Sequence, residues 1–368
     1  MSSGFTYTFS AIRGVQAKRE YYVSMCPLRL IPKLFSFEDV DMPPEVRAQR
    51  IINRSRVPEI SDYIVANTTD YTFSAITASI DGAVNFEPVG SGPDQFRMGT
   101  LSISMDARFI VNDGQHRREA IRLALEKVPE LGDETIAVVF FLDRGLERSQ
   151  QMFADLNRHA VKPSPSLNIL YDHRNSSASL ARHLVLTSPR FKGIVEMEKT
   201  TLSERSRKLF TLSAIEGSIR ELFTEPELDD LPSAKLKCIE YWEMVSDLFN
   251  HWNAVRDGTV SAGEIRTSYI HCHAVTLQAL GRIGRQLYAV NPKNLRVELK
   301  KLSKIDWSRD NRKVWDGRAM LGDRMEKSNL SVTLTANQIK LSIGLKLTAD
   351  EQQAERTLKQ MRANKKRG

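Results

Sequence analysis

The chain has 368 residues, 41% hydrophobic and 27% charged, which is ordinary for a soluble globular protein and long enough for one large or two medium domains. No apolar run approaches the roughly 20 residues that cross a bilayer, so a membrane-spanning helix is not expected. The N-terminus lacks the basic and apolar stretches of a signal peptide, so a signal peptide is not expected either. Three widely spaced cysteines favour a reduced, cytoplasmic compartment, and a net charge of +8 permits nucleic-acid binding.

The first 175 residues mix strand and helix patterns. Phe5, Tyr7 and Phe9 alternate with polar residues, which predicts a half-buried strand over residues 5–12. Asp81-Gly82 is a hairpin turn signal, so the strand before it is expected to pair with the short segment after it. The strand before this turn is expected over residues 72–80 and the segment after it over 84–86. Two further strands of this region are expected over residues 18–25 and 99–105.

A basic stripe lies on the helix expected over residues 45–55. Arg47, Arg50 and Arg54 recur at spacings of three and four, so they share one helix face. The usual interpretation of such a stripe is a solvated surface. In a basic protein, contact with DNA or nucleotide phosphates is the second interpretation, which makes these arginines candidate DNA-binding residues.

The central segment, 109–120, combines three local signals. The apolar run 109–111 predicts the end of a strand, Asn112-Asp113-Gly114 is a turn signal, and a helical pattern begins at Gln115. The first backbone N–H groups of a helix lack internal partners and carry partial positive charge. A strand, tight turn and helix in this order can therefore form an anion cradle suited to phosphate.

The side chains of this turn suit the same chemistry. Gly114 lets a ligand approach the main chain, Arg117 and Arg118 add fixed positive charge, and His116 adds a donor that can also move a proton. The candidate phosphate contacts here are Gly114, Gln115, His116 and Arg117. The candidate catalytic groups are Asp113, His116 and Asp155, since a carboxylate can hold magnesium or orient water and histidine can move a proton. The alternative is a structural turn whose basic residues face water.

A continuous apolar run over residues 136–142 predicts a strand that is covered on both faces, as in an α/β core. A helix is expected over 146–158. Asp155, Asn157 and Arg158 lie near its end and could face the anion cradle, with Asn157 and Arg158 as phosphate contacts. Capping of the helix end is the alternative role for these residues.

From about residue 176 the strand-like alternation largely disappears. Trp242 and Trp252 are expected to pack in a helical core. The segment 271–273, His-Cys-His, invites a metal interpretation, but adjacent and i,i+2 residues point to different helix faces, so no metal site is expected. Helices are expected over residues 177–187, 213–223, 234–249, 270–288 and 339–345, followed by a tail helix that starts near Thr348.

Aromatic and basic residues interleave over residues 300–318. Trp307 and Trp315 lie among several lysines and arginines, a composition that single-strand and backbone binders use. The alternative is that both tryptophans anchor a loop. The candidate DNA-binding residues of this segment are Arg309, Arg312 and Lys313.

Residues 113–117, Asp-Gly-Gln-His-Arg, match letter for letter the motif that names the DGQHR-domain family. The segment 152–164 looks like the second signature of that family, 47–64 resembles its N-terminal helix, and 305–318 also fits. Taken together, most of the chain resembles the DndB family, the regulatory proteins of bacterial DNA phosphorothioation systems, which put sulfur into the DNA backbone.

The resemblance implies a negative regulator that binds DNA near the modification operon. The DGQHR core also resembles the fold shared by ParB partition proteins and sulfiredoxin, where a Gly-x-x-Arg or Gly-x-His-Arg turn at a helix start grips nucleotide phosphates. Carried over to this chain, Gly114, His116 and Arg117 would contact phosphate. The family leaves open whether a nucleotide is hydrolysed, only held, or absent.

We therefore expect an α+β protein, with a ParB/sulfiredoxin-like mixed α/β core over residues 1–175 and a mainly helical domain with a basic tail over 176–368. The expected function is that of a DNA-binding negative regulator of phosphorothioation that acts on its operon promoter. The alternative is a nucleoside triphosphatase or nucleotide switch, with magnesium, coupled to DNA binding or nicking. A scaffold that uses the turn only structurally is a third possibility. The expected partners are double-stranded DNA, other phosphorothioation proteins and a second copy of the chain, without a membrane.

Overall fold

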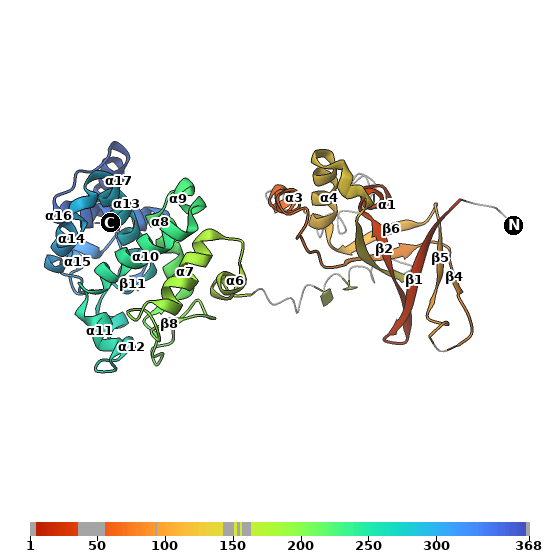
Figure 1. Cartoon of the computed structure of the whole chain (residues 1–368), viewed down its shortest axis with the longest axis horizontal. Helices are drawn as coiled ribbons and strands as arrows, with labels where there is room; N and C mark the ends of the chain where they lie inside the picture. Colours follow the sequence, from red (N-terminus) through yellow and green to blue (C-terminus); the bar gives the residue numbers. More distant parts are fainter. Residues whose placement is uncertain are drawn as a thin grey trace. The chain divides into compact units, whose positions relative to one another are not determined.

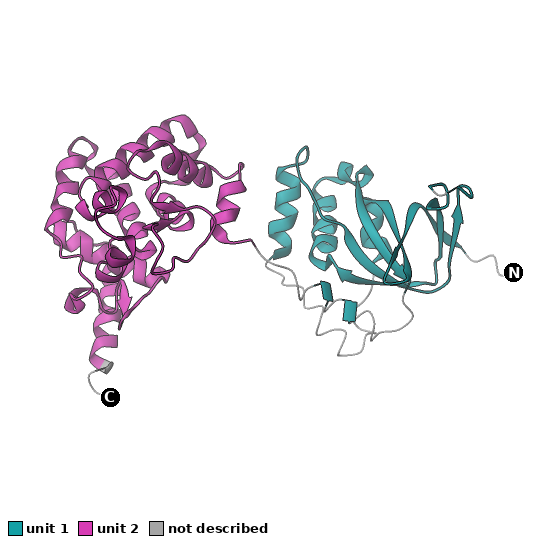
Figure 2. Cartoon of the chain, turned by 90° about the horizontal axis from the view of Figure 1, so that it is seen from below, with its two compact units in different colours: residues 1–161 teal, residues 162–368 magenta. Residues whose placement is uncertain are grey.

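A computed structural model describes residues 5–35, 56–92, 94–142, 151–152, 155–156 and 163–365. The chain forms two compact units, Met1–Val161 and Lys162–Gly368, which are coloured separately in Figure 2. The first unit is built on a mixed sheet and the second is mainly helical (Figure 1), so the expected α+β class is confirmed. The likeness to ParB and sulfiredoxin stays a prediction.

The sheet of the first unit has seven strands in the order β4-β5-β1-β2-β7-β3-β6. Only β3 and β7 run parallel, and every other neighbouring pair is antiparallel. The strands are β1 (Thr6–Gln16), β2 (Arg19–Pro27), β3 (Ile76–Asp81), β4 (Val84–Pro88), β5 (Met98–Ser104), β6 (Arg108–Asp113) and β7 (Thr135–Leu142).

One face of this sheet packs against helices α1 (Ile31–Leu34), α3 (Arg56–Ala66) and α4 (Gln115–Lys127) (Figure 1). Alternate residues of the central strands, such as Ile76, Ala78 and Ile80, are buried on this face. The ion pair between Lys127 and Asp62, 2.6 Å long, also joins α4 to α3. This packing fixes the position of the first turn of α4. Short 3-10 turns cover Leu28–Leu30 and Pro129–Asp133.

The expected hairpin at Asp81-Gly82 is wrong. The chain leaves β3 after Asp81, and β4 pairs with β5 at the far edge of the sheet, while β3 pairs with β7 and β6. The reason is burial. The side chains of Ile76 and Ile80 are apolar and are removed from water in the centre of the sheet, whereas the residues of β4 stay half-exposed and suit an edge.

Strand β7 also differs from the expectation of burial on both faces. Its residues alternate between buried side chains, such as Val138 and Phe140, and half-buried ones, such as Val139 and Phe141. The ring of Phe141 stacks on Tyr21 of the neighbouring strand, with centroids 5.5 Å apart. One face of β7 is therefore fully packed and the other is only partly covered among the described residues.

The second unit contains twelve described α-helices. They are α6 (Pro165–Tyr171), α7 (Ser176–Thr187), α8 (Leu212–Leu222), α9 (Glu225–Asp229), α10 (Leu231–Ser246), α11 (Asn250–Arg256), α12 (Ala262–Ser268), α13 (Ala274–Val290), α14 (Leu295–Lys300), α15 (Arg312–Trp315), α16 (Asn329–Ile343) and α17 (Ala349–Lys365). The short strand pairs are β8 (Val195–Glu196) with β9 (Phe210–Thr211), and β10 (Met320–Leu321) with β11 (Arg324–Met325). The 3-10 turns η4 (Pro292–Asn294) and η5 (Lys301–Lys304) flank α14.

The core of this unit forms around α8 and α13. The two helices run side by side so closely that a Cβ atom on Gly281 would lie 2.2 Å from the carbonyl oxygen of Ser218. Trp242 and Trp252 are fully buried in the same core, which confirms their predicted packing role. The four long helices expected between residues 177 and 288 are present, but α13 starts at Ala274 because the preceding residues form a turn.

The residues of α6 fall within the expected first domain, 1–175. Ile169 and Leu170 of this helix instead pack against the helical core, and α6 contacts both α7 and α8. Across the described part of the chain, no helix combines the length and the apolar character that a membrane span requires.

Candidate functional site

The DGQHR turn lies where β6 ends and α4 begins. Asp113 is the last residue of β6 and pairs with Thr77 of β3, and Gly114 is the N-cap of α4 with φ 106° and ψ 15°. This backbone conformation strongly favours glycine. A Cβ atom on Gly114 would also lie 3.0 Å from Ile76 and 3.1 Å from Nη2 of Arg117. The predicted strand, tight turn and helix are confirmed. The backbone conformation favours glycine at the turn, and a Cβ atom there would need Ile76 or Arg117 to shift slightly.

Arg117 closes this turn from inside the protein. Its Nη2 atom donates to Asp113 Oδ2 at 2.5 Å and to the carbonyl oxygen of Ala75 at 3.1 Å, and its Nη1 atom donates to the Ser74 hydroxyl. Its Nε atom is buried and has no acceptor within the described residues. Arg117 therefore joins the start of α4 to the segment before β3, and its charge is already partly balanced by Asp113.

His116 lies in a positive environment. Burial lowers its pKa first, and the nearby Arg56 and Arg117 lower it further, while Asp113 acts in the opposite direction. Near neutral pH the imidazole is therefore neutral. The side chain of Gln115 points back into the turn, where its Nε2 atom donates to the carbonyl oxygen of Val111 at 3.1 Å. Of these side chains, His116 is the one whose protonation an added anion would favour.

Asp155 lies in a separate pocket. This pocket, of about 570 Å³, is lined by the tip of the β1–β2 hairpin, the end of β7 and the residues around Met152, and it includes no residue of the 113–117 turn. Asp155 accepts a hydrogen bond from Nε2 of Gln151 at 2.7 Å. Met152 connects the two regions, because its sulfur lies 3.1 Å from Nδ2 of Asn112. The structure thus does not bring Asp155 and Asp113 into one pocket.

Two groups of candidate residues lie outside the described residues. They are the arginines of the expected basic stripe, Arg47, Arg50 and Arg54, and the helix-end residues Asn157 and Arg158.

Comparison with known proteins identifies the family. The model of the DndB family, described as DNA-sulfur modification-associated, matches residues 9–346. The chain belongs to the DndB family. No curated protein and no solved structure matches it. Because the match covers nearly the whole chain, both units of this DndB family member belong to the family's common architecture, and its involvement in DNA sulfur modification follows from that membership.

In this DndB family member, Arg309, Arg312 and Lys313 lie in the helical unit. Arg309 donates to the carbonyl oxygens of Arg266 and Asp323, and Arg312 forms an ion pair with the Asp323 carboxylate. Lys313 is exposed. Contact with DNA phosphates would therefore use Lys313 directly, whereas Arg309 and Arg312 would keep or exchange their internal partners.

The two tryptophans of the same segment anchor the loop. Trp307 and Trp315 stack on each other with centroids 5.6 Å apart, and both are buried. Their indole N–H groups donate to the carbonyl oxygens of Leu302 and Asp306. Because neither ring face is free, the base-stacking interpretation is wrong for these residues, and the structural alternative is confirmed.

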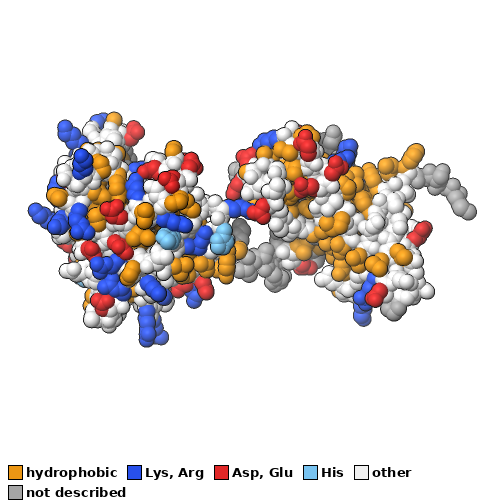
Figure 3. Space-filling view, in the orientation of Figure 1, with side chains coloured by type: hydrophobic (Ala, Val, Ile, Leu, Met, Phe, Trp, Pro, Cys, Tyr) orange, Lys and Arg blue, Asp and Glu red, His pale blue; other side chains and the backbone are white. Residues whose placement is uncertain are grey.

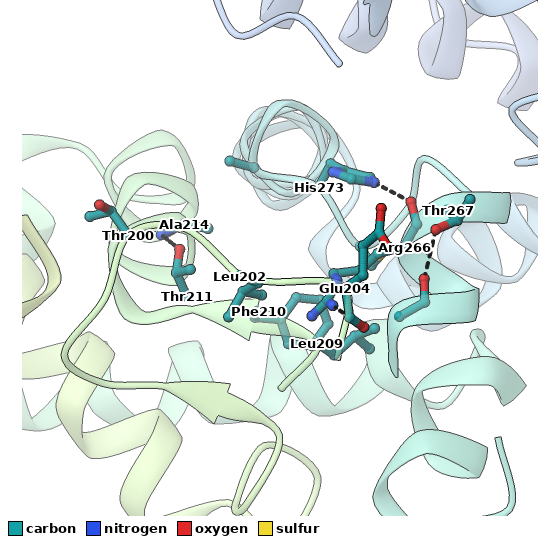
Figure 4. Close-up of a pocket in the computed structure, with 13 residues that line it drawn as sticks. Thr200, Leu202, Glu204, Leu209, Phe210, Thr211, Ala214, Arg266, Thr267 and His273 are labelled. Carbon is teal, nitrogen blue, oxygen red and sulfur yellow. Dashed lines mark hydrogen bonds between the residues drawn. The ribbon is translucent and has the colours of Figure 1, made fainter. Parts of the chain in front are cut away.

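A cavity that sequence reasoning missed lies near the start of α13 (Figure 4). It has a volume of about 330 Å³, and its lining includes Glu204, Thr211, Arg266 and His273. The guanidinium of Arg266 donates to the carbonyl oxygens of Ser203, Glu204 and Lys208, and Nε2 of His273 lies 2.8 Å from the carbonyl oxygen of Arg266. The side chains of Arg266 and His273 are therefore already hydrogen-bonded to backbone carbonyl oxygens around the cavity.

The segment 271–273 is a turn, so the helical argument against a metal does not apply to it. His271 accepts a hydrogen bond from the indole N–H of Trp252 at 3.0 Å, whereas His273 contacts the backbone of Arg266. The Cys272 thiol is buried, and burial raises its pKa to about 12. These three side chains belong to different contacts, and the described residues contain no cluster of three potential metal ligands.

Proposed function

We propose that the protein is a DNA-binding negative regulator of a bacterial DNA phosphorothioation system and that it acts on the promoter of its own operon. Family membership supports the connection with sulfur modification. Binding to other proteins of the system and self-association belong to the same proposal.

The distribution of charge supports DNA binding. Residues 162–368 contain 35 lysines and arginines against 24 aspartates and glutamates, a net charge of +11. Residues 1–161 contain 18 against 21, a net charge of −3. Basic side chains accordingly spread over the surface of the helical unit in Figure 3. The entire positive excess lies in one unit, and such a concentration favours attraction to phosphates.

Fluorescence anisotropy of the full chain with two labelled duplexes tests the proposal. One duplex carries the operon promoter and the other a scrambled sequence of the same composition. We expect tighter binding to the promoter and a steep fall of affinity between about 50 and 200 mM salt, because phosphate neutralisation releases counterions. Affinity that is flat with salt would contradict DNA binding through charge, and equal affinity for both duplexes would contradict promoter recognition.

The second candidate function is nucleotide binding at the DGQHR turn, as a switch or a hydrolase. The observation that favours it is the Nε atom of Arg117, a buried donor without an acceptor among the described residues, which lies beside Gly114 at the start of α4. A nucleotide phosphate would find there the backbone N–H groups of α4, with His116 and Arg56 as nearby donors. Magnesium bound by Asp113 would have to compete with the Arg117 ion pair.

Calorimetric titration of ATP, CTP and GTP into the protein, in the presence of magnesium, tests this second function. We expect binding that is lost in Arg117→Ala and weakened in His116→Gln. Because Arg117 also holds the turn closed, the melting temperature of each variant must be measured beside the affinity. Equal nucleotide affinity in a folded Arg117→Ala variant would remove the turn from nucleotide binding.

A further inference from the structure

Residues 292–304 form one almost continuous helical stretch, made of η4, α14 and η5. Leu295, Leu299 and Leu302 recur along it at spacings of four and three, and all three are buried in the core of the helical unit. The indole N–H of Trp307 donates to the carbonyl oxygen of Leu302 at 3.1 Å and holds the end of the stretch. The buried leucines fix which face of the helix points to solvent.

The opposite face carries a row of four cations, Lys293, Arg296, Lys300 and Lys304. We call it the basic row. Its first three members lie three and four residues apart and share one side of the helix, Lys304 follows at the end of the 3-10 turn η5, and all four side chains are exposed. In the described part of the chain, none of them has an ion pair or a side-chain hydrogen bond. Arg117, Arg266 and Arg309, in contrast, are held by internal acceptors.

The one carboxylate on the same stretch does not neutralise the basic row. Glu298 pairs with Lys301 at 2.7 Å, and Lys301 also reaches the carbonyl oxygen of Ile343. Acidic groups do lie near the start of the row, where Lys293 and Arg296 border a cleft of about 420 Å³ with Glu240, Glu243 and Asp247. Of these, Asp247 pairs with Arg190 at 2.7 Å and Glu243 accepts from Ser188. Lys300 and Lys304 are not among the residues that line the cleft.

We propose that the basic row is a phosphate-contacting surface for double-stranded DNA. This inference rests on the proposed DNA-binding function and assigns a place to it. With a rise of about 1.5 Å per residue in α14 and about 2.0 Å in the 3-10 turns, the row spans roughly 16–20 Å and presents a cation about every 5–7 Å. DNA carries one charge per about 1.7 Å of axis, so a row of this length faces several phosphates at once. Such contacts supply affinity and orientation, and base recognition lies elsewhere.

Two variants of the full chain with equal charge loss test the inference. The first removes the basic row by the substitutions Lys293→Ala, Arg296→Ala, Lys300→Ala and Lys304→Ala. The control removes four exposed cations elsewhere in the helical unit by the substitutions Lys192→Ala, Arg205→Ala, Arg207→Ala and Arg356→Ala. Melting temperatures establish that both variants fold. The affinity of each for the same labelled duplex is then measured over a salt series.

For the basic-row variant we expect affinity to fall at least about 100-fold near 0.1 M salt. The slope of log affinity against log salt should shrink by up to about 3.6, since each of the four lost phosphate contacts removes about 0.9. The affinity of the control variant for DNA should fall by less than about 10-fold. If the wild type binds DNA and the slope is unchanged in the basic-row variant, the inference that the basic row contacts phosphates is overturned, while the proposed DNA-binding function stands. Equal losses in both variants would show that only net charge matters and would also overturn the inference. Absence of DNA binding by the wild type would overturn the proposed function together with this inference.

Discussion

Arg117 donates to three acceptors, in Asp113, Ala75 and Ser74, and so holds the DGQHR turn in place. The sequence predicted that Gly114 and Arg117 would lie together at a helix start. It could not predict the acceptors of Arg117 at Ser74 and Ala75, because they come from a segment about forty residues earlier that only the sheet brings near. Local patterns specify a turn, whereas its partners depend on tertiary contacts.

The turn makes a prediction about Gly114. Replacing it with alanine should lower the free energy of unfolding by about 1–3 kcal/mol, because the side chain meets both an unfavourable φ and a close contact with Ile76. Gly344→Ala is the matched control, since Gly344 also has a positive φ but open space around its Cβ position. Urea unfolding should show a larger loss of unfolding free energy for Gly114→Ala than for Gly344→Ala. Equal losses would mean that the contact with Ile76 contributes nothing.

Two buried histidines predict sensitivity to acid. Burial, with the nearby His251 and His273, lowers the pKa of His271 to about 3, and burial lowers the pKa of His273 to about 4. Both values lie below the unfolded value of about 6.5. The stability that the neutral rings provide is therefore fully present above pH 6.5 and is lost as the pH falls toward the folded pKa values.

The expected slope is up to about 1.4 kcal/mol per pH unit for each histidine between about pH 6 and pH 4. In His271→Gln the free energy of unfolding should depend less steeply on pH over this range. The part of the slope that His271 and His273 contribute together should fall by about half. His173→Gln, at an exposed position, serves as the control and should keep the wild-type slope. Denaturant unfolding at several pH values measures both, and parallel curves for all three proteins would contradict the assignment.

At the scale of elements, helices were easier to predict than strand pairing. The apolar spacing within α7, α8, α10 and α13 is a local property, and each of these helices overlaps the range that it predicts. The order of the sheet is not local, because β4 leaves β3 and pairs with β5 at the other edge. The start of α13 was also misplaced, since Tyr269 forms a bridge with Ser308, about forty residues later in the chain.

The packing of α8 on α13 leads to an element-scale prediction. Gly281→Ala should destabilise the protein by about 1–3 kcal/mol or more, because the new Cβ atom would lie 2.2 Å from the backbone oxygen of Ser218 and the helices would have to separate. In an exposed helix position the same change would be stabilising. Ala289→Ser, on the exposed end of α13, should change stability by less than about 0.5 kcal/mol. A stabilised Gly281→Ala variant in thermal melts would show that the two helices are not in this close contact.

For the whole molecule, the net charge of +8 conceals an uneven distribution. The sequence alone indicated a basic protein, but assigning the charge to a helical unit of +11 and a sheet unit of −3 required the boundary between the compact units. The candidate nucleotide site at the DGQHR turn therefore belongs to the slightly acidic unit, and the basic row belongs to the basic one. The two proposed sites therefore lie in different units of the chain.

This division predicts that the two sites can be separated by mutation. In a folded Arg117→Ala variant, the salt dependence of DNA binding should keep the wild-type slope within about one unit, because no phosphate-contacting cation of the basic row is lost. The basic-row variant should bind nucleotide as the wild type does. If the sites are independent, the free energy of DNA binding should be additive. A variant that combines Arg117→Ala with the four basic-row substitutions should then lose the sum of the two separate losses, within about 0.5 kcal/mol. A larger deviation would mean that the turn and the basic row act on one ligand or on one conformational equilibrium, since only coupled sites depart from additivity.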